Sequence, residues 1–290
     1  MEGLSLNVYH YPASQGGFRS LPMTKYLINI PLHLESLGFS AKLTGGHMAR
    51  SMMLDEMTAL TSTVPVEASL ENYRQAILED NTLGKPTYSS RQKSYRHLVE
   101  LYGLDPSKAL FAALRHLGKA EPTSLPLLAL VCTFCRDAQL RQSFSIIDHL
   151  FAGEKLSRID METHLEEGFP DRFSEKMKKS LAQNVNTTWT VAGHLKGRST
   201  KTRSFPTPHP AATVYAMFAG SLLGLRADNL VQSVFGRLIA PDTALILQHL
   251  AHAASRGWIR FRHAGGVMET DFSPLMTWIN HEQDLAYVSH

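Results

Sequence analysis

The chain has 290 residues, of which 43% are hydrophobic, and this is enough apolar material to bury a large core. The composition excludes a globally disordered protein. The formal net charge of +3 is too small to imply a nucleic-acid partner by itself, so the distribution of charge along the chain matters more.

The sequence predicts a soluble, cytoplasmic protein without a membrane segment. Its first residues, MEGLSLNVYHYP, lack the basic and then apolar pattern of a secretory signal. The longest apolar run, Leu125 to Cys135, is too short to span a bilayer.

The N-terminal half is expected to contain an arm followed by a helical domain. Residues 1–38 are rich in turn-forming Pro and Gly and predict the arm. Residues 39–152 predict the N-terminal helical domain, because apolar spacing and capping signals recur along it. Thr44 to His47, TGGH, is expected to be a turn. The helices are predicted at 49–61, 69–79, 89–101, 105–118, 122–141 and 143–151.

The C-terminal half, residues 153–290, is predicted to form a second helical domain after a boundary at Gly153. Two short alternating runs around Gly265 and Gly266 predict a β-hairpin after the last of its helices. The helices are predicted at 160–167, 174–185, 187–195, 211–223, 228–239 and 242–255. The fold class is therefore mainly α, with two helical domains, helix-turn-helix or winged-helix-like elements and a small C-terminal hairpin.

Motifs that carry catalysis or metal binding are missing from the sequence. It contains no phosphate-binding GxxxxGK[ST] loop, no GxSxG and no HExxH. Cys132 and Cys135 lie in an apolar run without a second ligand pair, so they are expected to be buried core residues rather than zinc ligands. We therefore expect no enzymatic activity, no metal and no cofactor.

A basic, turn-rich strip follows one predicted helix pair and suggests a nucleic-acid contact. Residues 174–185 would be the supporting helix of a helix-turn-helix unit and 187–195 its recognition helix. The strip from Lys196 to Arg203 would then be a wing against the phosphates. The candidate DNA-binding residues of this unit are Thr187, Thr188, Trp189, His194, Lys196, Arg198, Lys201 and Arg203. The alternative is a solvated basic loop beside a buried Trp189.

Two other basic regions are candidates for the same role. Residues 85–119 carry seven basic and two acidic side chains, and Arg91, Lys93 and Arg96 are the candidate DNA contacts among them. The hairpin after 242–255 gives the order of elements found in a winged helix, with arginines nearby. In both regions a plain solvated face is the alternative.

Three stretches resemble the BrxA family of bacterial BREX phage-defence systems. They are FSAKLTGGHMARSMMLDEM, ENYRQAILEDNTLGKPTYSSRQKSYRHLVELYGLD and TWTVAGHLKGRSTKTR, within a span from Phe39 to Phe272. The resemblance implies a helical, cytoplasmic, non-enzymatic protein with winged-helix-like parts that binds DNA. That family has also been likened to an RNA-binding antitermination factor. The arm before Phe39 is a departure from the family.

These observations together predict a non-enzymatic component of a phage-defence system that binds double-stranded DNA. Other proteins of the system are possible partners. Two alternatives stay open, an RNA-binding, antitermination-like protein and an assembly scaffold within a defence complex.

Overall fold

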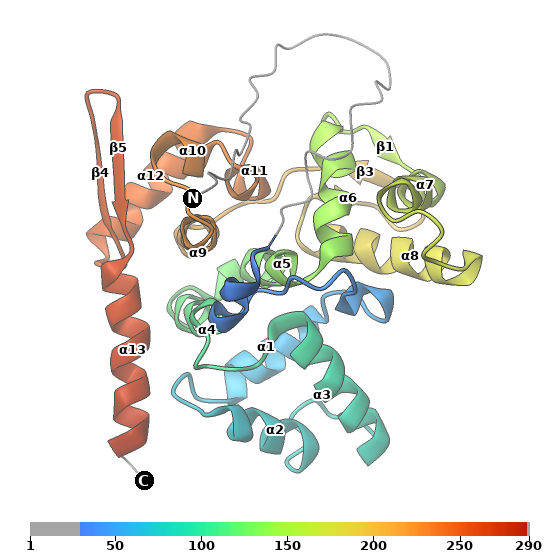
Figure 1. Cartoon of the computed structure of the whole chain (residues 1–290), viewed down its shortest axis with the longest axis horizontal. Helices are drawn as coiled ribbons and strands as arrows, with labels where there is room; N and C mark the ends of the chain where they lie inside the picture. The colour runs from blue at the N-terminus through green and yellow to red at the C-terminus, as the bar shows by residue number, and fades with distance from the viewer. Residues whose placement is uncertain (1–29, 289–290) are drawn as a thin grey trace.

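The described chain is built mainly of helices around one hydrophobic core (Figure 1). The structure is a computed structural model that describes residues 30–288. Most of the predicted arm, residues 1–29, therefore lies outside the described residues. A mainly helical fold with a C-terminal β-hairpin is confirmed. No helix within the described range is long and apolar enough to cross a membrane.

Side-chain caps set the starts of several helices in the N-terminal half. Ser69 and Thr87 form capping boxes with Asn72 and Ser90, which fixes the starts of α2 and α3. The elements of this half are η2 (Leu32–Leu37), η3 (Gly46–Met48), α1 (Leu54–Thr63), α2 (Leu70–Leu78), α3 (Tyr88–Tyr102), α4 (Ala109–Ala120), η4 (Pro122–Ser124), α5 (Leu125–Arg136) and α6 (Ala138–His149).

The single helix predicted over 122–141 is wrong, because the chain breaks at Asp137. This residue has an extended backbone, and its carboxylate accepts the N–H groups of Gln139 and Leu140 at 2.9 and 3.0 Å. Asp137 is therefore the N-cap of α6 and turns the chain between α5 and α6.

The C-terminal half contains two groups of elements, each of which ends in an antiparallel hairpin. The first comprises β1 (Lys155–Leu156), α7 (Arg158–Gly168), α8 (Glu175–Val191), β2 (Leu195–Lys196) and β3 (Lys201–Arg203). Its three strands pair in the order β1-β3-β2. The second comprises α9 (Pro210–Leu222), α10 (Ala227–Val231), α11 (Val234–Ile239), α12 (Thr243–Ser255), β4 (Arg260–Ala264) and β5 (Val267–Asp271). The chain continues into α13 (Ser273–Val288), which is not among the predicted elements.

The predicted turn at Asn186 is wrong, because α8 runs unbroken through it. Asn186 is buried inside the helix, and the hydroxyls of Thr187 and Thr190 donate to carbonyls four residues earlier. These local bonds satisfy the threonine hydroxyls without ending the helix. The helix pair of this region is therefore α7 and α8, not 174–185 and 187–195.

The predicted C-terminal hairpin is confirmed. Phe261 pairs with Thr270, and Ala264 pairs with Val267 across a two-residue turn. Gly265 and Gly266 both have positive φ, 60° and 76°, which a tight two-residue hairpin turn requires.

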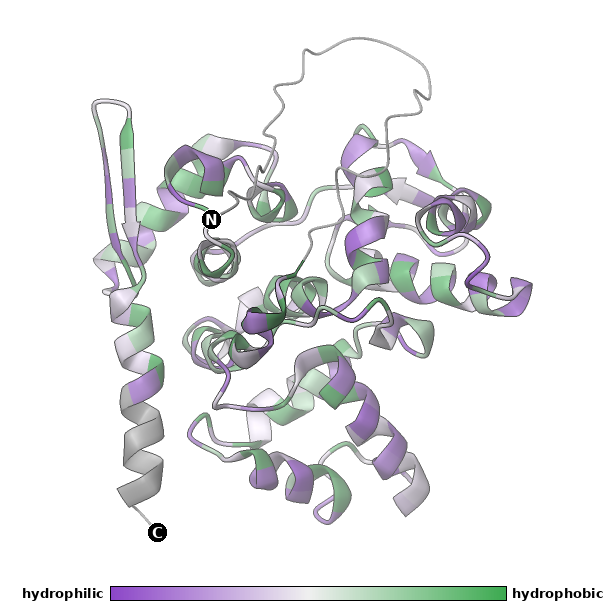
Figure 2. Cartoon of the chain, viewed as in Figure 1, coloured by the Kyte–Doolittle hydropathy of each residue, from purple (hydrophilic) through white to green (hydrophobic). Residues whose placement is uncertain are grey.

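Helices α5 and α9 form the centre of the core and connect the two halves of the chain. Both are apolar along most of their length, as the green ribbon in Figure 2 shows, and nearly all of their residues are buried. Helix α9 packs against α4 and α5, and Tyr215 Oη donates to Leu110 O at 2.9 Å. One continuous core thus includes residues on both sides of Gly153. The division into two domains stays a prediction.

Candidate nucleic-acid interface

Helix α8 presents a polar stripe to solvent. Its opposite side is buried, with Leu181, Val185 and Trp189 inside the core. The stripe consists of exposed side chains three or four residues apart, a spacing that keeps them on one face of a helix. These are Lys176, Lys179, Gln183 and Thr187.

The two lysines of this stripe are available to a ligand. Neither Lys176 nor Lys179 has an ion-pair partner within the described residues, although Lys178 is bound to Glu166 and Glu175. Neither lysine was predicted from the sequence. Their exposure depends on which face of α8 packs into the core, and this is known only from the structure.

The basic strip forms the hairpin of β2 and β3. Lys196 and Arg198 are exposed, whereas Lys201 is half-buried and its Nζ donates to Gly197 O at 2.7 Å. Gly197 has a φ of 99°, and a Cβ there would lie 2.3 Å from Thr200 O. Only glycine fits this tight turn, which holds the exposed cations at the tip of the hairpin.

Four of the predicted contact residues point into the protein instead of toward solvent. Each of them is at most 3% exposed, so none can reach DNA in this structure. They are Thr188, Trp189, His194 and Arg203. Trp189 Nε1 donates to Ser143 Oγ at 2.8 Å, inside the core. For Thr188 and Trp189 the unbroken α8 is the reason, because it places Trp189 on the same inner face as Val185.

His194 and Arg203 form a buried pair beneath the hairpin. His194 Nε2 lies 3.0 Å from Leu238 O and donates to it, so Nδ1 can accept from Arg203 Nη1 at 3.1 Å. Burial and, next, the Arg203 charge lower the pKa of His194 to about 3. The guanidinium of Arg203 also stacks on Phe205, 4.2 Å from the ring centre. This pair therefore fastens the hairpin to the core.

Helix α3 exposes two of its three predicted contact residues. Lys93 and Arg96 face solvent. Arg91 instead turns inward, and its Nη1 donates to Leu78 O at 2.6 Å and to Glu79 O at 3.2 Å. Arg91 thus caps the C-terminus of α2 rather than offering its charge to a ligand.

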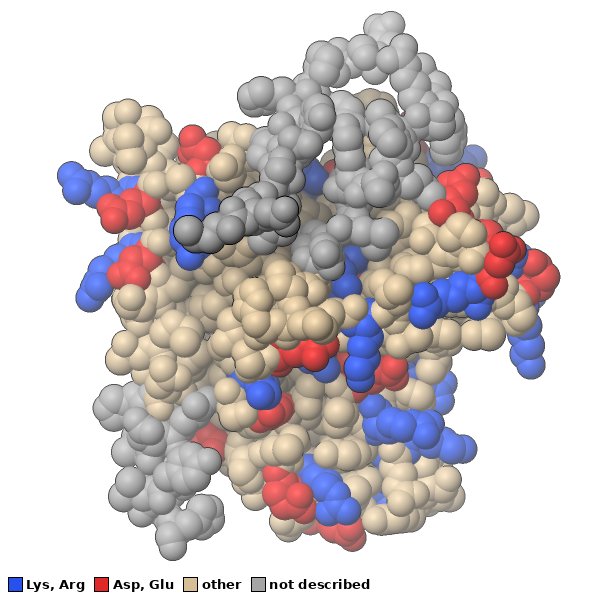
Figure 3. Space-filling view, in the orientation of Figure 1, with Lys and Arg blue, Asp and Glu red and all other residues tan. Residues whose placement is uncertain are grey.

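A cleft brings residues of α3 and α8 together. Its volume is about 460 Å³, and α1, α3 and α8 border it. Thr187 and Lys93, which belong to separate basic regions of the sequence, both line this cleft, together with Arg50. Figure 3 shows Lys and Arg side chains over both α8 and α3 on the right-hand side of the molecule.

The β4–β5 hairpin presents fewer unpaired cations than the β2–β3 hairpin. Arg260 Nη1 lies 2.9 Å from Asp271 Oδ2, and Arg262 is paired in register with Glu269. The helix before it, α12, contains no Lys or Arg. Of the two similar groups of elements, only the first presents a helix with free lysines next to a basic hairpin.

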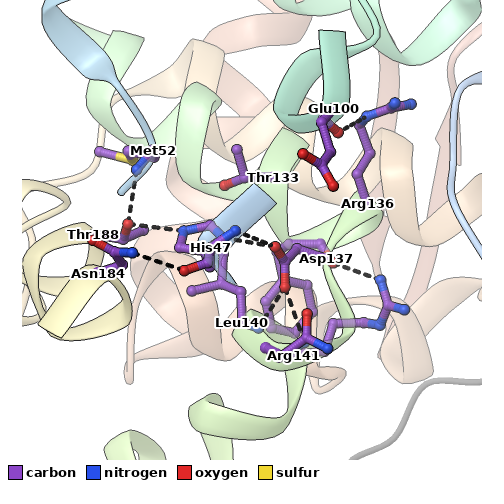
Figure 4. Close-up of polar contacts among 12 residues, drawn as sticks. His47, Met52, Glu100, Thr133, Arg136, Asp137, Leu140, Arg141, Asn184 and Thr188 are labelled. Carbon is purple, nitrogen blue, oxygen red and sulfur yellow. Dashed lines mark hydrogen bonds and ion pairs between the residues drawn. The ribbon is translucent and has the colours of Figure 1, made fainter. Parts of the chain in front are cut away.

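A buried polar network anchors α8 to the N-terminal half (Figure 4). His47 Nδ1 donates to Asp137 Oδ2 at 2.9 Å, and Thr188 Oγ1 donates to His47 Nε2 at 2.9 Å. Thr188 Oγ1 also accepts the Met52 N–H at 3.0 Å, and Asn184 Nδ2 donates to His47 O at 2.9 Å. His47 and Thr188 are 0% exposed.

The buried position of this network suits a structural role. Its order of hydroxyl, imidazole and carboxylate resembles that of a hydrolase triad. However, the Thr188 hydroxyl is fully buried and already both donates and accepts. Burial alone would raise the pKa of Asp137, but His47 and the backbone amides together lower it, so the carboxylate stays charged.

Close packing around this network explains why the TGGH turn contains two glycines. A Cβ on Gly45 would lie 2.0 Å from the Asp137 carboxylate, and one on Gly46 would lie 2.6 Å from Leu101. Gly45 therefore lets the backbone approach Asp137, and Gly46 lets it approach Leu101. Sequence reasoning predicted the turn but missed His47 and Asp137 as partners, since they are 90 residues apart.

In the part of the chain that the structure describes, no group of three or more His, Cys, Asp or Glu side chains could hold a metal ion. Cys132 and Cys135 are buried as predicted, and burial raises the pKa of Cys132 to about 11. Comparisons with known protein families, curated proteins and solved structures find no match to this chain.

The Asp137→Ala variant tests the network through stability. It leaves the His47 ring and amide N–H groups buried without an acceptor, and it also removes the cap of α6. We expect a loss of about 3 kcal/mol or more in the free energy of unfolding, measured by urea denaturation. The control is Asp242→Ala, an exposed N-cap without a buried partner, for which a loss of about 1 kcal/mol is expected. Equal losses in the two variants would contradict the importance of the network.

Because His194 is buried, we expect the folded protein to lose stability as the pH falls. Its pKa of about 3 lies below the ordinary value, so the unfolded chain binds a proton more readily than the folded one. The stability that depends on neutral His194 is complete above about pH 6.5 and falls by up to about 1.4 kcal/mol per pH unit below it. The His194→Gln variant should therefore show a shallower loss of stability than wild type between pH 7 and pH 5, in urea titrations. Replacing the exposed His263 by Gln serves as the control, and an unchanged slope in His194→Gln would refute the assignment.

Proposed function

We propose that this chain is a non-enzymatic, double-stranded DNA-binding component of a bacterial phage-defence system of the BREX type. The observation that carries DNA binding is the exposed stripe of α8, with two unpaired lysines, directly before a hairpin with two exposed cations. The connection to phage defence rests on the resemblance of three sequence stretches to the BrxA family.

The order of elements around α8 supports a winged-helix reading. The chain runs α6, β1, α7, α8, β2, β3, and the strands pair in the order β1-β3-β2. In a winged helix, the helix before the hairpin is the recognition helix and the hairpin is the wing. Helix α8 would then take the place of the recognition helix, and the β2–β3 hairpin that of the wing.

The chemistry of the α8 stripe suits a DNA groove. Lys176 and Lys179 can neutralise phosphates near the N-terminal end of the helix. Gln183, midway along the helix, can form paired hydrogen bonds with the N6 and N7 edge of adenine in the major groove. Lys196 and Arg198 of the hairpin tip would meet the adjacent backbone. This surface replaces Thr188, Trp189, His194 and Arg203 as the proposed contacts.

The Lys176→Glu/Lys179→Glu variant tests this surface. Wild type should bind a labelled random duplex with a log affinity that falls linearly with log salt concentration, measured by fluorescence anisotropy. The variant should bind at least about tenfold more weakly, and its salt slope should be smaller by roughly two, one for each phosphate that is no longer neutralised. Both lysines are exposed, so the circular dichroism spectrum should not change.

The matched control is Lys42→Glu/Arg262→Glu, which makes the same change in charge at two exposed positions outside the α8 stripe and the β2–β3 hairpin. Equal weakening in the two variants would show that only net charge matters and would refute the α8 site. Tighter binding to duplex RNA than to DNA of the same sequence would favour the RNA-binding alternative. Absence of any binding at low salt would favour an assembly scaffold.

A further inference from the structure

The cleft between α1, α3 and α8 has cations that the described protein does not neutralise. Arg50, Lys85 and Lys93 line it together with the carboxylates of Asp55 and Glu56. Lys85 Nζ lies 2.8 Å from Glu56 Oε1, so these two charges compensate each other. Arg50 and Lys93 are exposed and have no ion-pair partner within the described range. Two free cations therefore face one unpaired carboxylate, that of Asp55.

A neighbouring histidine lies in the positive electrostatic field of the arginines beside this cleft. His97 lies on α3, and its pKa is lowered first by burial and then by the charges of Arg50 and Arg96. Both arginines are thus close enough to His97 to oppose its protonation. The region around the cleft therefore disfavours added positive charge and favours an anion.

The cleft also offers neutral hydrogen-bond donors. Ser51 and Ser94 line it, and neither side chain makes a hydrogen bond to another described residue. The first turn of α1 borders the cleft as well, and its N-cap, Met53, supplies no side-chain acceptor for the amides there. Free cations, free hydroxyls and uncapped amides are the groups that bind phosphate oxygens in proteins.

We infer that this cleft binds a phosphate group, with Arg50 and Lys93 as its charged ligands and Ser51 and Ser94 as neutral donors. The phosphate can come from two sources. One is the backbone of a duplex bound along α8, because Thr187 belongs to both the α8 stripe and the cleft lining. This source rests on the proposed function. The other is a phosphorylated small molecule, for which a volume of about 460 Å³ is sufficient.

The first experiment measures thermal unfolding of the full chain in inorganic phosphate and in chloride at the same ionic strength. Wild type should be stabilised more by phosphate than by chloride. In Arg50→Gln/Lys93→Gln, the phosphate concentration that gives half of the stabilisation should rise at least about tenfold, because two charge-assisted hydrogen-bond donors are removed. Lys42→Gln/Arg262→Gln, with the same number of exposed cations removed outside the cleft, should behave like wild type.

The Asp55→Asn variant makes the opposite prediction. It removes the unpaired carboxylate and leaves the cations in place, so half-maximal stabilisation should require less phosphate than in wild type. Equal stabilisation of wild type and Arg50→Gln/Lys93→Gln by phosphate would overturn the inference, since it would reflect only a general salt effect. The same holds if phosphate stabilises wild type no more than chloride does.

A second experiment distinguishes the two sources. If the phosphate belongs to a duplex, Arg50→Gln/Lys93→Gln should reduce the salt slope of duplex binding by roughly two, and inorganic phosphate should compete with the duplex. If it belongs to a small molecule, duplex binding should be unchanged while a nucleoside monophosphate replaces inorganic phosphate at lower concentration. Failure of wild type to bind any duplex would refute the proposed function, but the thermal experiment would still decide whether the cleft binds phosphate.

Discussion

The buried contact between His47, Asp137 and Thr188 fixes the position of the helix on which the proposed interface depends. It connects η3, the junction of α5 and α6, and the inner face of α8 through three side chains that water does not reach. A buried polar group without its partner is costly, so each member makes the others necessary. Thr188 is locked inward by these bonds, and its neighbour Thr187 is therefore directed outward into the cleft.

Basic residues in this protein serve two different purposes, and only their surroundings tell them apart. Arg91, Arg136 and Arg203 donate to backbone carbonyls at helix ends or beneath a hairpin, so their charge is used within the fold. Lysines of the α8 stripe have no such partner in the described chain. A count of charge along the sequence adds both groups together and overstates the charge available to a ligand.

Local signals in the sequence were sufficient to predict much of the fold. Ser69 with Asn72 marked the start of α2, and the glycine pair at 265–266 marked the hairpin turn. Long-range contacts explain what was missed. The contact of Asp137 with His47 spans 90 residues. Two local features were also misread: Asp137 is the N-cap of α6, and Asn186 resembles a turn residue although α8 continues through it.

The candidate site was less predictable than the fold. Thr187, Lys93, Arg96, Lys196 and Arg198 are exposed as predicted, but Lys176, Lys179 and Arg50 were not identified. Whether a helical side chain faces solvent depends on the phase of the helix. An error of one helix boundary, such as the turn placed at Asn186, was enough to exchange buried and exposed positions in α8.

The central position of α9 has a consequence for synthesis of the protein on the ribosome. Helix α5 is apolar and almost wholly buried, and part of its cover is α9, which begins at Pro210. Before α9 is synthesised, the nascent chain therefore carries an apolar helix that is only partly covered. Vectorial folding cannot complete this part of the core until α9 has left the exit tunnel, and until then the exposed apolar surface of α5 favours aggregation.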